Sequence, residues 1–299
     1  MYAYKQISKV YHSAKIIPFH NYSQIVIMSD CHRGDGNWSD NFAKNQNLFL
    51  AALNKYNIHN YTYIELGDGD ELWENKKISD IIDAYKAVFW LMSRFYKNDR
   101  FYSLFGNHDI VKDLPNYAKN NLSSYFDARE KKEIPLFPNI KFEEGLILKN
   151  IDTGYEIFLL HGHQADLLND TLWRVNRFLV RYFWKPLELI GVNDPTSASK
   201  NYKRKKWVEK KLINWVKREN KILIAGHTHR SIMPKPGEPL YFNSGSCVHP
   251  RCITAIEILM GTILLVKWSY KTRIDGTVYV GRDVLEGPIK LQDYYQQSQ

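Results

Sequence analysis

Cysteine is scarce in this chain, which has three cysteines among its 299 residues and no C-x-x-C pair. An odd number of cysteines argues against a disulfide scaffold. Long apolar runs are absent too, because none approaches the roughly 18 residues that suggest a membrane span. The first twenty residues lack the apolar core of a secretion signal. These absences together predict a protein of the reducing cytoplasm.

The overall composition is ordinary for a globular protein, with 44% hydrophobic and 24% charged residues. Aromatic residues are abundant, at 14% of the chain. A chain of this length can bury a substantial core, and we expect one domain across residues 1–299.

Positive charge is concentrated in one stretch of the chain. Residues 167–221 contain fourteen Lys or Arg and five Asp or Glu. This surplus of nine equals the net charge of +9 of the whole chain, so the remaining residues are balanced. The basic character therefore belongs to an insert and not to the whole surface.

Apolar strand-like runs and helical patterns alternate in the first hundred residues, which is typical of a parallel α/β core. Further on, a turn at 152–154 between two apolar runs predicts a hairpin. We expect an irregular lead-in over 1–23, helices over 41–56 and 79–96, strands at 24–29, 61–66, 100–105, 146–148, 155–160 and 222–225, more strands in the tail, and disorder over 296–299.

Five of the expected strands end in a short polar motif. Ligands bind at the carboxyl ends of the strands in open α/β sheets. A single Asp or His after a strand is usually a cap or a surface residue, but five such motifs in order indicate a metal site. Six of the ten histidines lie in these motifs. The groups that could ligate a metal are Asp30, His32, Asp68, Asn107, His161, His227 and His229.

Oxygen and imidazole ligands without thiolates suit divalent ions such as manganese, iron or zinc. Seven groups exceed the roughly four to six ligands of one ion, unless two ions share a bridging ligand. The sequence motifs are Asp30-x-His32, Gly67-Asp68, Gly106-Asn107-His108-Asp109, His161-Gly162-His163 and Gly226-His227-x-His229. Over residues 24 to about 246, this series resembles the calcineurin-like metallophosphoesterases.

The resemblance implies a four-layer α/β/β/α sandwich with a site for two divalent metal ions. We expect a helical lid insert within this fold, and manganese as the metal, with iron or zinc as the alternatives. It also implies which ligands each ion takes. One ion would bind Asp30, His32, Asp68 and His229, and the other would bind Asp68, Asn107, His161 and His227, so that Asp68 bridges them.

The chemistry that follows is attack of a metal-bridging hydroxide on phosphorus. His108 would be the general acid that protonates the leaving oxygen. Asp109 could hold the imidazole ring of His108, although a structural Asp in a turn is an equal alternative.

Several nearby residues are candidates for supporting roles, each with a surface or structural role as the alternative. Carboxylates that could orient a ligand imidazole are Asp70, Glu71 and Glu74. Candidate substrate contacts are Arg33, His163 and Asn243, with His249 and Arg251 as weaker guesses. His163 could instead orient a metal ligand.

The basic insert, residues 167–221, should contain two helices, over 171–185 and 202–218, around a polar loop at 191–199. Its apolar stripes could simply pack on the core. Alternatively, the insert is a lid that contacts an anionic membrane or admits an acyl chain. Nucleic acid is a third possibility.

A helical insert at this position is similar to the lid of UDP-2,3-diacylglucosamine hydrolase, a peripheral membrane pyrophosphatase. That enzyme has Arg at the position of His108, so the leaving-group chemistry differs. We therefore expect a phosphohydrolase acting on a phosphorylated small molecule or a nucleotide-linked lipid. A protein Ser/Thr phosphatase, a nuclease and a non-enzymatic binding scaffold are the alternatives.

Overall fold

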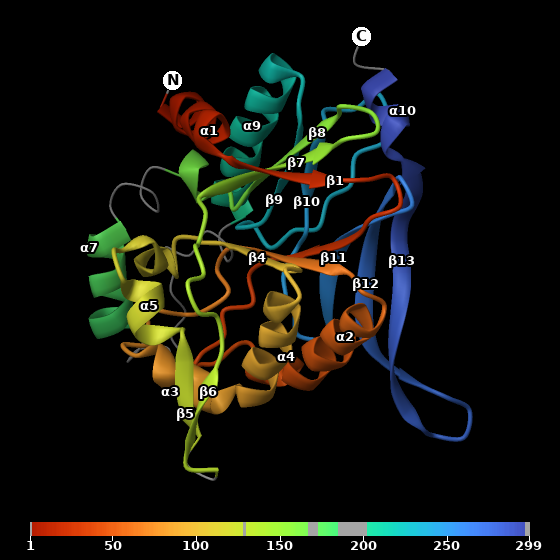
Figure 1. Cartoon of the computed structure of the whole chain (residues 1–299). Coiled ribbons are helices and arrows are strands. Elements are labelled where there is room, and N and C mark those ends of the chain that lie inside the picture. Colours follow the sequence, from red (N-terminus) through yellow and green to blue (C-terminus); the bar gives the residue numbers. More distant parts are fainter. Residues whose placement is uncertain (1, 128–129, 167–172, 185–201, 297–299) are drawn as a thin grey trace.

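The computed structural model describes residues 2–127, 130–166, 173–184 and 202–296. Two β-sheets lie face to face, with helices on both outer faces (Figure 1). This arrangement confirms the expected α/β/β/α sandwich.

The first sheet has six strands in the order β13-β12-β11-β2-β3-β4. The three N-terminal strands are parallel to one another, and the C-terminal strands join them antiparallel. The strands are β2 (Gln24–Met28), β3 (Thr62–Leu66), β4 (Phe101–Leu104), β11 (Cys252–Leu259), β12 (Thr262–Thr272) and β13 (Val278–Lys290).

The second sheet has five strands in the order β1-β7-β8-β9-β10. The expected hairpin is confirmed as the antiparallel pair β7 and β8, and β8, β9 and β10 are parallel. The strands are β1 (Lys15–Phe19), β7 (Gly145–Asn150), β8 (Glu156–Leu160), β9 (Ile222–Ala225) and β10 (Tyr241–Asn243).

Strand β2 shows why the apolar runs are continuous and do not alternate with polar residues. Ile25 and Ile27 face the second sheet, in a buried cluster that continues to α1 (Tyr2–Ser13) and α9 (Tyr202–Glu219). Val26 and Met28 face the outer core under α2 (Gln46–Ile58) and α4 (Lys86–Lys97). A strand that is buried on both faces needs apolar residues at every position.

Two expectations about the chain ends were wrong. Residues 1–23 are not an irregular lead-in, because α1 buries Ala3, Ile7 and Val10, and β1 pairs in parallel with β7. At the other end, Gln296 is the last residue of α10 (Leu291–Gln296), although disorder was expected there. Residues 297–299 lie outside the described part of the chain.

The helix expected over 79–96 is two helices, α3 (Ile78–Ala84) and α4, which meet at Tyr85. The buried Tyr85 hydroxyl donates a hydrogen bond to Asp40. Short elements fill the remaining connections. They are η1 (Ala43–Asn45), η2 (Ile110–Asp113), α5 (Tyr117–Asn121), the hairpin of β5 (Ser124–Asp127) and β6 (Lys132–Pro135), and η3 (His163–Ala165).

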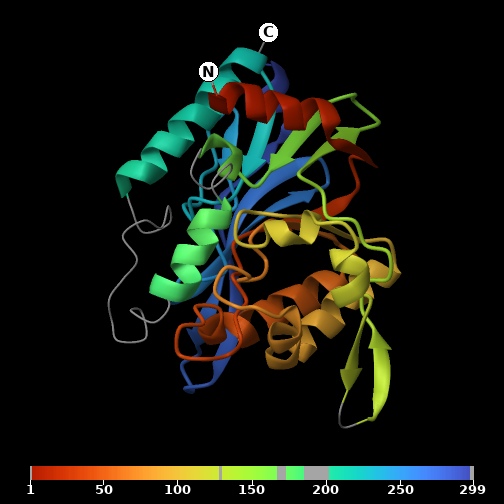
Figure 2. The same cartoon turned by 90° about the vertical axis from the view of Figure 1, so that its left-hand side faces the viewer.

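The described parts of the basic insert are helical, as expected. They comprise α7 (Trp173–Leu179), which continues as the π-helical η4 (Val180–Trp184), and then α9. Both α7 and α9 are visible on one side of the molecule in Figure 2. The expected loop at 191–199 lies outside the described residues. Within the described chain, no helix is long and apolar enough to cross a membrane.

We expect Trp215→Ala to destabilise the fold by about 3–5 kcal/mol. The Trp215 side chain is fully buried, its ring packs near Tyr11 and Phe158, and its indole N–H donates to Ser8 Oγ at 2.9 Å. Urea unfolding followed by circular dichroism measures the loss. Trp38→Ala is the control, because Trp38 is fully exposed and its removal should change the free energy of unfolding by less than about 0.5 kcal/mol. Equal effects of the two substitutions would contradict this assignment.

Candidate metal centre

The seven expected ligand residues follow the strands β2, β3, β4, β8 and β9. Parallel neighbouring strands bring their carboxyl ends to the same edge of a sheet. Backbone hydrogen bonds continue past the strand ends and fix the polar motifs to one another. Asp30 N donates to Gly67 O at 3.1 Å, and His32 N donates to Asp68 O at 2.9 Å.

Five of these residues have a backbone conformation that is rare outside glycine. Their φ angles lie between 46° and 66°, in the left-handed region. Such strain costs of order 1–3 kcal/mol per residue and concentrates at functional sites, where the surrounding fold enforces it. The five are Asp30, His32, Asp68, His227 and His229.

Glycine is required where these loops approach one another. A Cβ atom on Gly106 would lie 2.1 Å from Asp68 Oδ1, and one on Gly226 would lie 2.7 Å from Asp30 Oδ2. Both glycines therefore allow a close approach to a candidate ligand carboxylate.

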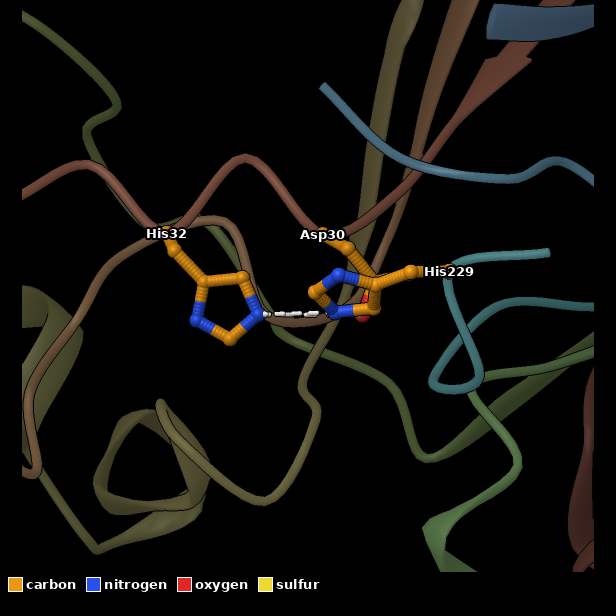
Figure 3. A group of neighbouring side chains, drawn as sticks. All are labelled: Asp30, His32 and His229. Carbon is orange, nitrogen blue, oxygen red and sulfur yellow. Dashed lines mark hydrogen bonds and ion pairs between the residues drawn. The ribbon is translucent and has the colours of Figure 1, made fainter. Parts of the chain in front are cut away.

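One group of candidate ligands consists of Asp30, His32 and His229 (Figure 3). His229 Nε2 is 3.0 Å from Asp30 Oδ1, and His32 Nε2 is 3.3 Å from His229 Nε2. His32 Nε2 also lies 3.8 Å from Asp30 Oδ1. Three potential ligand atoms from the segments after β2 and after β9 thus converge on one point.

The second group consists of Asp68, His161 and His227. Asp68 Oδ2 is 3.2 Å from His161 Nε2 and 3.7 Å from His32 Nε2 of the first group. The same carboxylate oxygen therefore lies next to both groups. This is the geometry that a bridging carboxylate requires.

Buried atoms without hydrogen bonds test whether the site suits metal ions. Four buried ligand atoms have no hydrogen-bond partner among the described residues, although an unpaired buried polar group costs about 1–3 kcal/mol. All four can give a lone pair to a divalent cation, so the residues fit a metal centre. The atoms are Asp30 Oδ1, Asn107 Oδ1, His161 Nε2 and His227 Nε2.

The opposite sides of these ligands are held by hydrogen bonds. His161 Nδ1 donates to Leu66 O at 2.9 Å, so Nε2 is the ring nitrogen that can bind a metal. Asp30 Oδ2 accepts from His227 N at 3.0 Å, which leaves Oδ1 free. Each side chain therefore turns one atom toward the centre.

The carboxylates of the site are held in the ionised form that binds metals. Burial by itself raises the pKa of Asp30, but the imidazoles of His229 and His32 outweigh burial and hold this pKa well below its usual range. The pKa of Asp68 is lowered in the same way, because His161 and His108 outweigh burial.

His108 lies beside the ligands and its ring is fixed from two sides. Its Nδ1 donates to Glu71 Oε1 at 2.8 Å, and the indole of Trp73 stacks on the ring at 4.3 Å with an interplanar angle of 23°. Glu71 Oε2 also accepts from His32 Nδ1 at 2.9 Å. Burial lowers the pKa of His108, but Glu71 and Asp68 outweigh burial and raise it above the ordinary value.

The expectation that Asp109 holds the ring of His108 was wrong, because Glu71 does so. Asp109 is buried and accepts from the backbone N–H of Gly106 at 2.7 Å and of Gly69 at 3.1 Å, and from Lys112 Nζ at 2.6 Å. It therefore joins the loops after β3 and β4, which carry Asp68 and Asn107.

The expectation that Arg33 clamps a phosphate was also wrong. Its guanidinium is fully buried and makes two hydrogen bonds to Glu65, at 2.7 and 2.9 Å, and one to Asp70 at 2.7 Å. Asp70 also pairs with Lys112 at 2.7 Å. Arg33 and Asp70 thus form a buried ionic network under the site, and Asp70 does not orient a ligand imidazole.

Asn243 was expected to contact substrate, but its side chain supports the loop after β9. Its amide donates to Gly226 O at 2.7 Å, and its Oδ1 accepts from Gly245 N at 2.9 Å. Burial, with His161 and His227 nearby, lowers the pKa of His163 well below the ordinary value, so this buried residue is neutral. Its role in substrate binding stays a prediction.

The other candidates lie at the edge of the site. Arg251 is exposed in the turn before β11, and its contact with substrate stays a prediction. His249 Nδ1 contacts Cys252 Sγ at 3.3 Å. Glu74 Oε2 accepts from Ser39 Oγ at 3.3 Å, and a role for Glu74 in orienting a ligand imidazole stays a prediction.

Sequence reasoning missed Trp73 and Asp166. Asp166 binds Arg204 of α9 through both carboxylate oxygens, at 2.8 and 2.9 Å, and lies 3.9 Å from His227 Nε2. The position of Asp166 shortly after the His161-Gly162-His163 motif was a usable signal. The sequence contained no such signal for Trp73, because no sequence pattern predicts that an indole stacks on His108.

Asp68→Ala should abolish binding of both metal ions, because its Oδ2 lies next to both groups of ligands. Elemental analysis of the purified variant after incubation with manganese measures the bound metal per chain. Asp83→Ala, a substitution at an exposed acidic residue, is the control and should bind as much metal as the wild type. Retention of both ions by Asp68→Ala would contradict the bridging role.

Comparisons with known proteins give a family for this chain. A model of the family described as calcineurin-like phosphoesterase matches residues 23–231, well over half of the chain. No curated protein matches. Among solved structures, the crystal structure of Chaetomium thermophilum Vps29 is similar over 88% of this chain and 96% of that chain. The sequence identity between the two chains is 10%, and the TM-score is 0.39. By its family match, the chain belongs to the calcineurin-like phosphoesterases.

Proposed function

We propose that this protein is a metal-dependent phosphohydrolase that cleaves a phosphate ester or a pyrophosphate bond, with His108 as the general acid. The observation that carries the proposal is the set of buried, unpaired ligand atoms on both sides of Asp68, next to a histidine fixed by Glu71. Two divalent cations fit these ligands. Manganese is the first choice, and iron or zinc are alternatives.

The ligand residues divide into two sets, with one carboxylate in common. Asp30, His32, Asp68 and His229 would hold one cation, and Asp68, Asn107, His161 and His227 would hold the other. Such ions, when bound, neutralise the charge of phosphate oxygens and supply a nucleophile from water at neutral pH.

The role of His108 follows from the hydrogen bond at its other nitrogen. Since Nδ1 is bonded to Glu71, Nε2 is the atom that can hold a proton toward the leaving oxygen. Glu71 and Asp68 raise the pKa of His108, which favours the protonated ring that a general acid requires. The side chain is also partly exposed, so a substrate can reach it.

A binding scaffold with a vestigial site is the non-enzymatic alternative. The ligand set favours the enzyme, because a scaffold gains nothing from strained backbone and unpaired buried atoms that cost stability. A protein Ser/Thr phosphatase or a nuclease would use the same centre. Hydrolysis assays with phosphopeptides and with oligonucleotides distinguish these two alternatives from an enzyme that acts on small molecules.

A lipid-linked substrate at an anionic membrane surface is the second candidate, as in the UDP-2,3-diacylglucosamine pyrophosphatases. The basic insert supports this second candidate, because apolar side chains are exposed on α7 and η4 within the most basic part of the chain. Val175 is 55%, Phe178 is 61% and Tyr182 is 55% exposed. Exposed apolar residues among basic ones suit the interface of an anionic bilayer.

His108→Ala should slow hydrolysis of alkyl phosphates by about 10²–10⁴-fold, because a poor leaving group needs the proton. Activated aryl phosphates should be slowed much less, and the metal content should not change. Steady-state kinetics with the two substrate classes, under manganese, measures the difference. Equal slowing of both classes would rule out the general-acid role.

The wild type should sediment with vesicles that contain phosphatidylglycerol and less with pure phosphatidylcholine vesicles, because of the basic insert. Phe178→Ser should weaken this binding, since it removes an exposed apolar side chain of α7. Ile274→Ser, in the fully exposed turn between β12 and β13, is the control. No sedimentation of the wild type with either vesicle would remove the membrane proposal.

A further inference from the structure

The basic insert is attached to the rim of the metal centre through arginines. Arg204 of α9 binds Asp166, as described above, and Arg181 of η4 binds the loop after β3. We propose that Arg181 is a positioning residue for His108, acting through the segment 71–75. The inference rests on the proposed role of His108 as the general acid.

Arg181 binds three backbone carbonyls of this single segment. Its Nε donates to Trp73 O at 2.9 Å, and its Nη2 donates to Leu72 O at 2.7 Å and to Asn75 O at 3.1 Å. Hydrogen bonds from a charged donor are stronger than neutral ones, and the planar fork of arginine can span several acceptors that lie apart. The guanidinium therefore fixes the path of the backbone between Leu72 and Asn75.

The same segment holds His108. Glu71, at its start, accepts the hydrogen bond from His108 Nδ1, and Trp73 stacks on the ring. The backbone of Glu71 is anchored in the core, because Glu71 N donates to Arg33 O at 2.9 Å. The start of the segment thus has its own anchor, independent of the insert.

Trp73 has no such anchor of its own. Its indole Nε1 is buried without a hydrogen-bond partner among the described residues, so the side chain is held by packing and by the position of its backbone. The hydrogen bond from Arg181 to the carbonyl of Trp73 is therefore a direct restraint on the indole that faces His108. Loss of Arg181 should let the indole and the imidazole turn, while the metal ligands stay in place.

The predicted effect is a loss of leaving-group assistance and not of metal binding. Arg181→Ala and Arg181→Lys should both slow alkyl phosphates by about ten- to a hundredfold, as expected for a misplaced catalytic group, and aryl phosphates far less. Lysine keeps the charge but lacks the separate Nε and Nη2 donors that contact these carbonyls, so it separates positioning from charge. Arg174→Ala is the matched control, because Arg174 is an exposed arginine of α7 whose described contact is the Trp173 ring.

A double substitution shows whether Arg181 acts through His108. In a His108→Ala background, Arg181→Ala should have no further effect on the ratio of alkyl to aryl phosphate turnover. Independent effects that multiply would overturn the positioning role.

Hydrogen exchange provides a readout that does not depend on activity. Amide exchange over residues 71–76, measured by mass spectrometry, should be faster in both Arg181 variants and unchanged in Arg174→Ala. Unchanged exchange in the Arg181 variants would overturn the positioning role alone. A wild type that binds manganese but hydrolyses no phosphate ester would instead overturn the proposed function, while the exchange result would still test the restraint.

Discussion

The shared position of Asp68 is the interaction on which the rest of this site depends. Its Oδ2 lies between His161 of one ligand group and His32 of the other, and its Oδ1 accepts from the backbone N–H of His108 at 2.8 Å. One carboxylate therefore connects both ligand groups and the candidate general acid. Ligands from five strands can converge on it because the parallel strands of both sheets end at the same edge.

A buried ionic network holds this arrangement from below. Arg33 and Lys112 are the cations, and Glu65, Asp70 and Asp109 are the anions. Buried ion pairs rarely add stability over apolar packing, but removal of one partner costs about 3–5 kcal/mol. In this site the ion pairs fix the positions of two loops, because Asp109 binds backbone N–H groups of the loops that carry Asp68 and Asn107.

Much of the fold and of the ligand set could be predicted from the sequence, since both depend on local patterns. An apolar run followed by Asp-x-His marks a strand and its end, and the sheet topology brings these ends together. The hydrogen bond from His32 to Glu71 agrees with the prediction that Glu71 orients a ligand imidazole. The contact of Glu71 with His108 and the roles of Arg33 and Asp109 could not be predicted, because they depend on which of several neighbouring charges face one another in space. The helix α1 and the strand β1 were not predicted for a similar reason. Tertiary contacts with β7 and α9 stabilise them, and their own sequences carry no strong local pattern.

The most direct test of the central claim is anomalous X-ray diffraction from crystals of the protein grown with manganese. The account predicts two manganese peaks per chain, one beside Asp30, His32 and His229 and one beside Asn107, His161 and His227, with the Asp68 carboxylate in contact with both. A single peak, or peaks remote from Asp68, would contradict it.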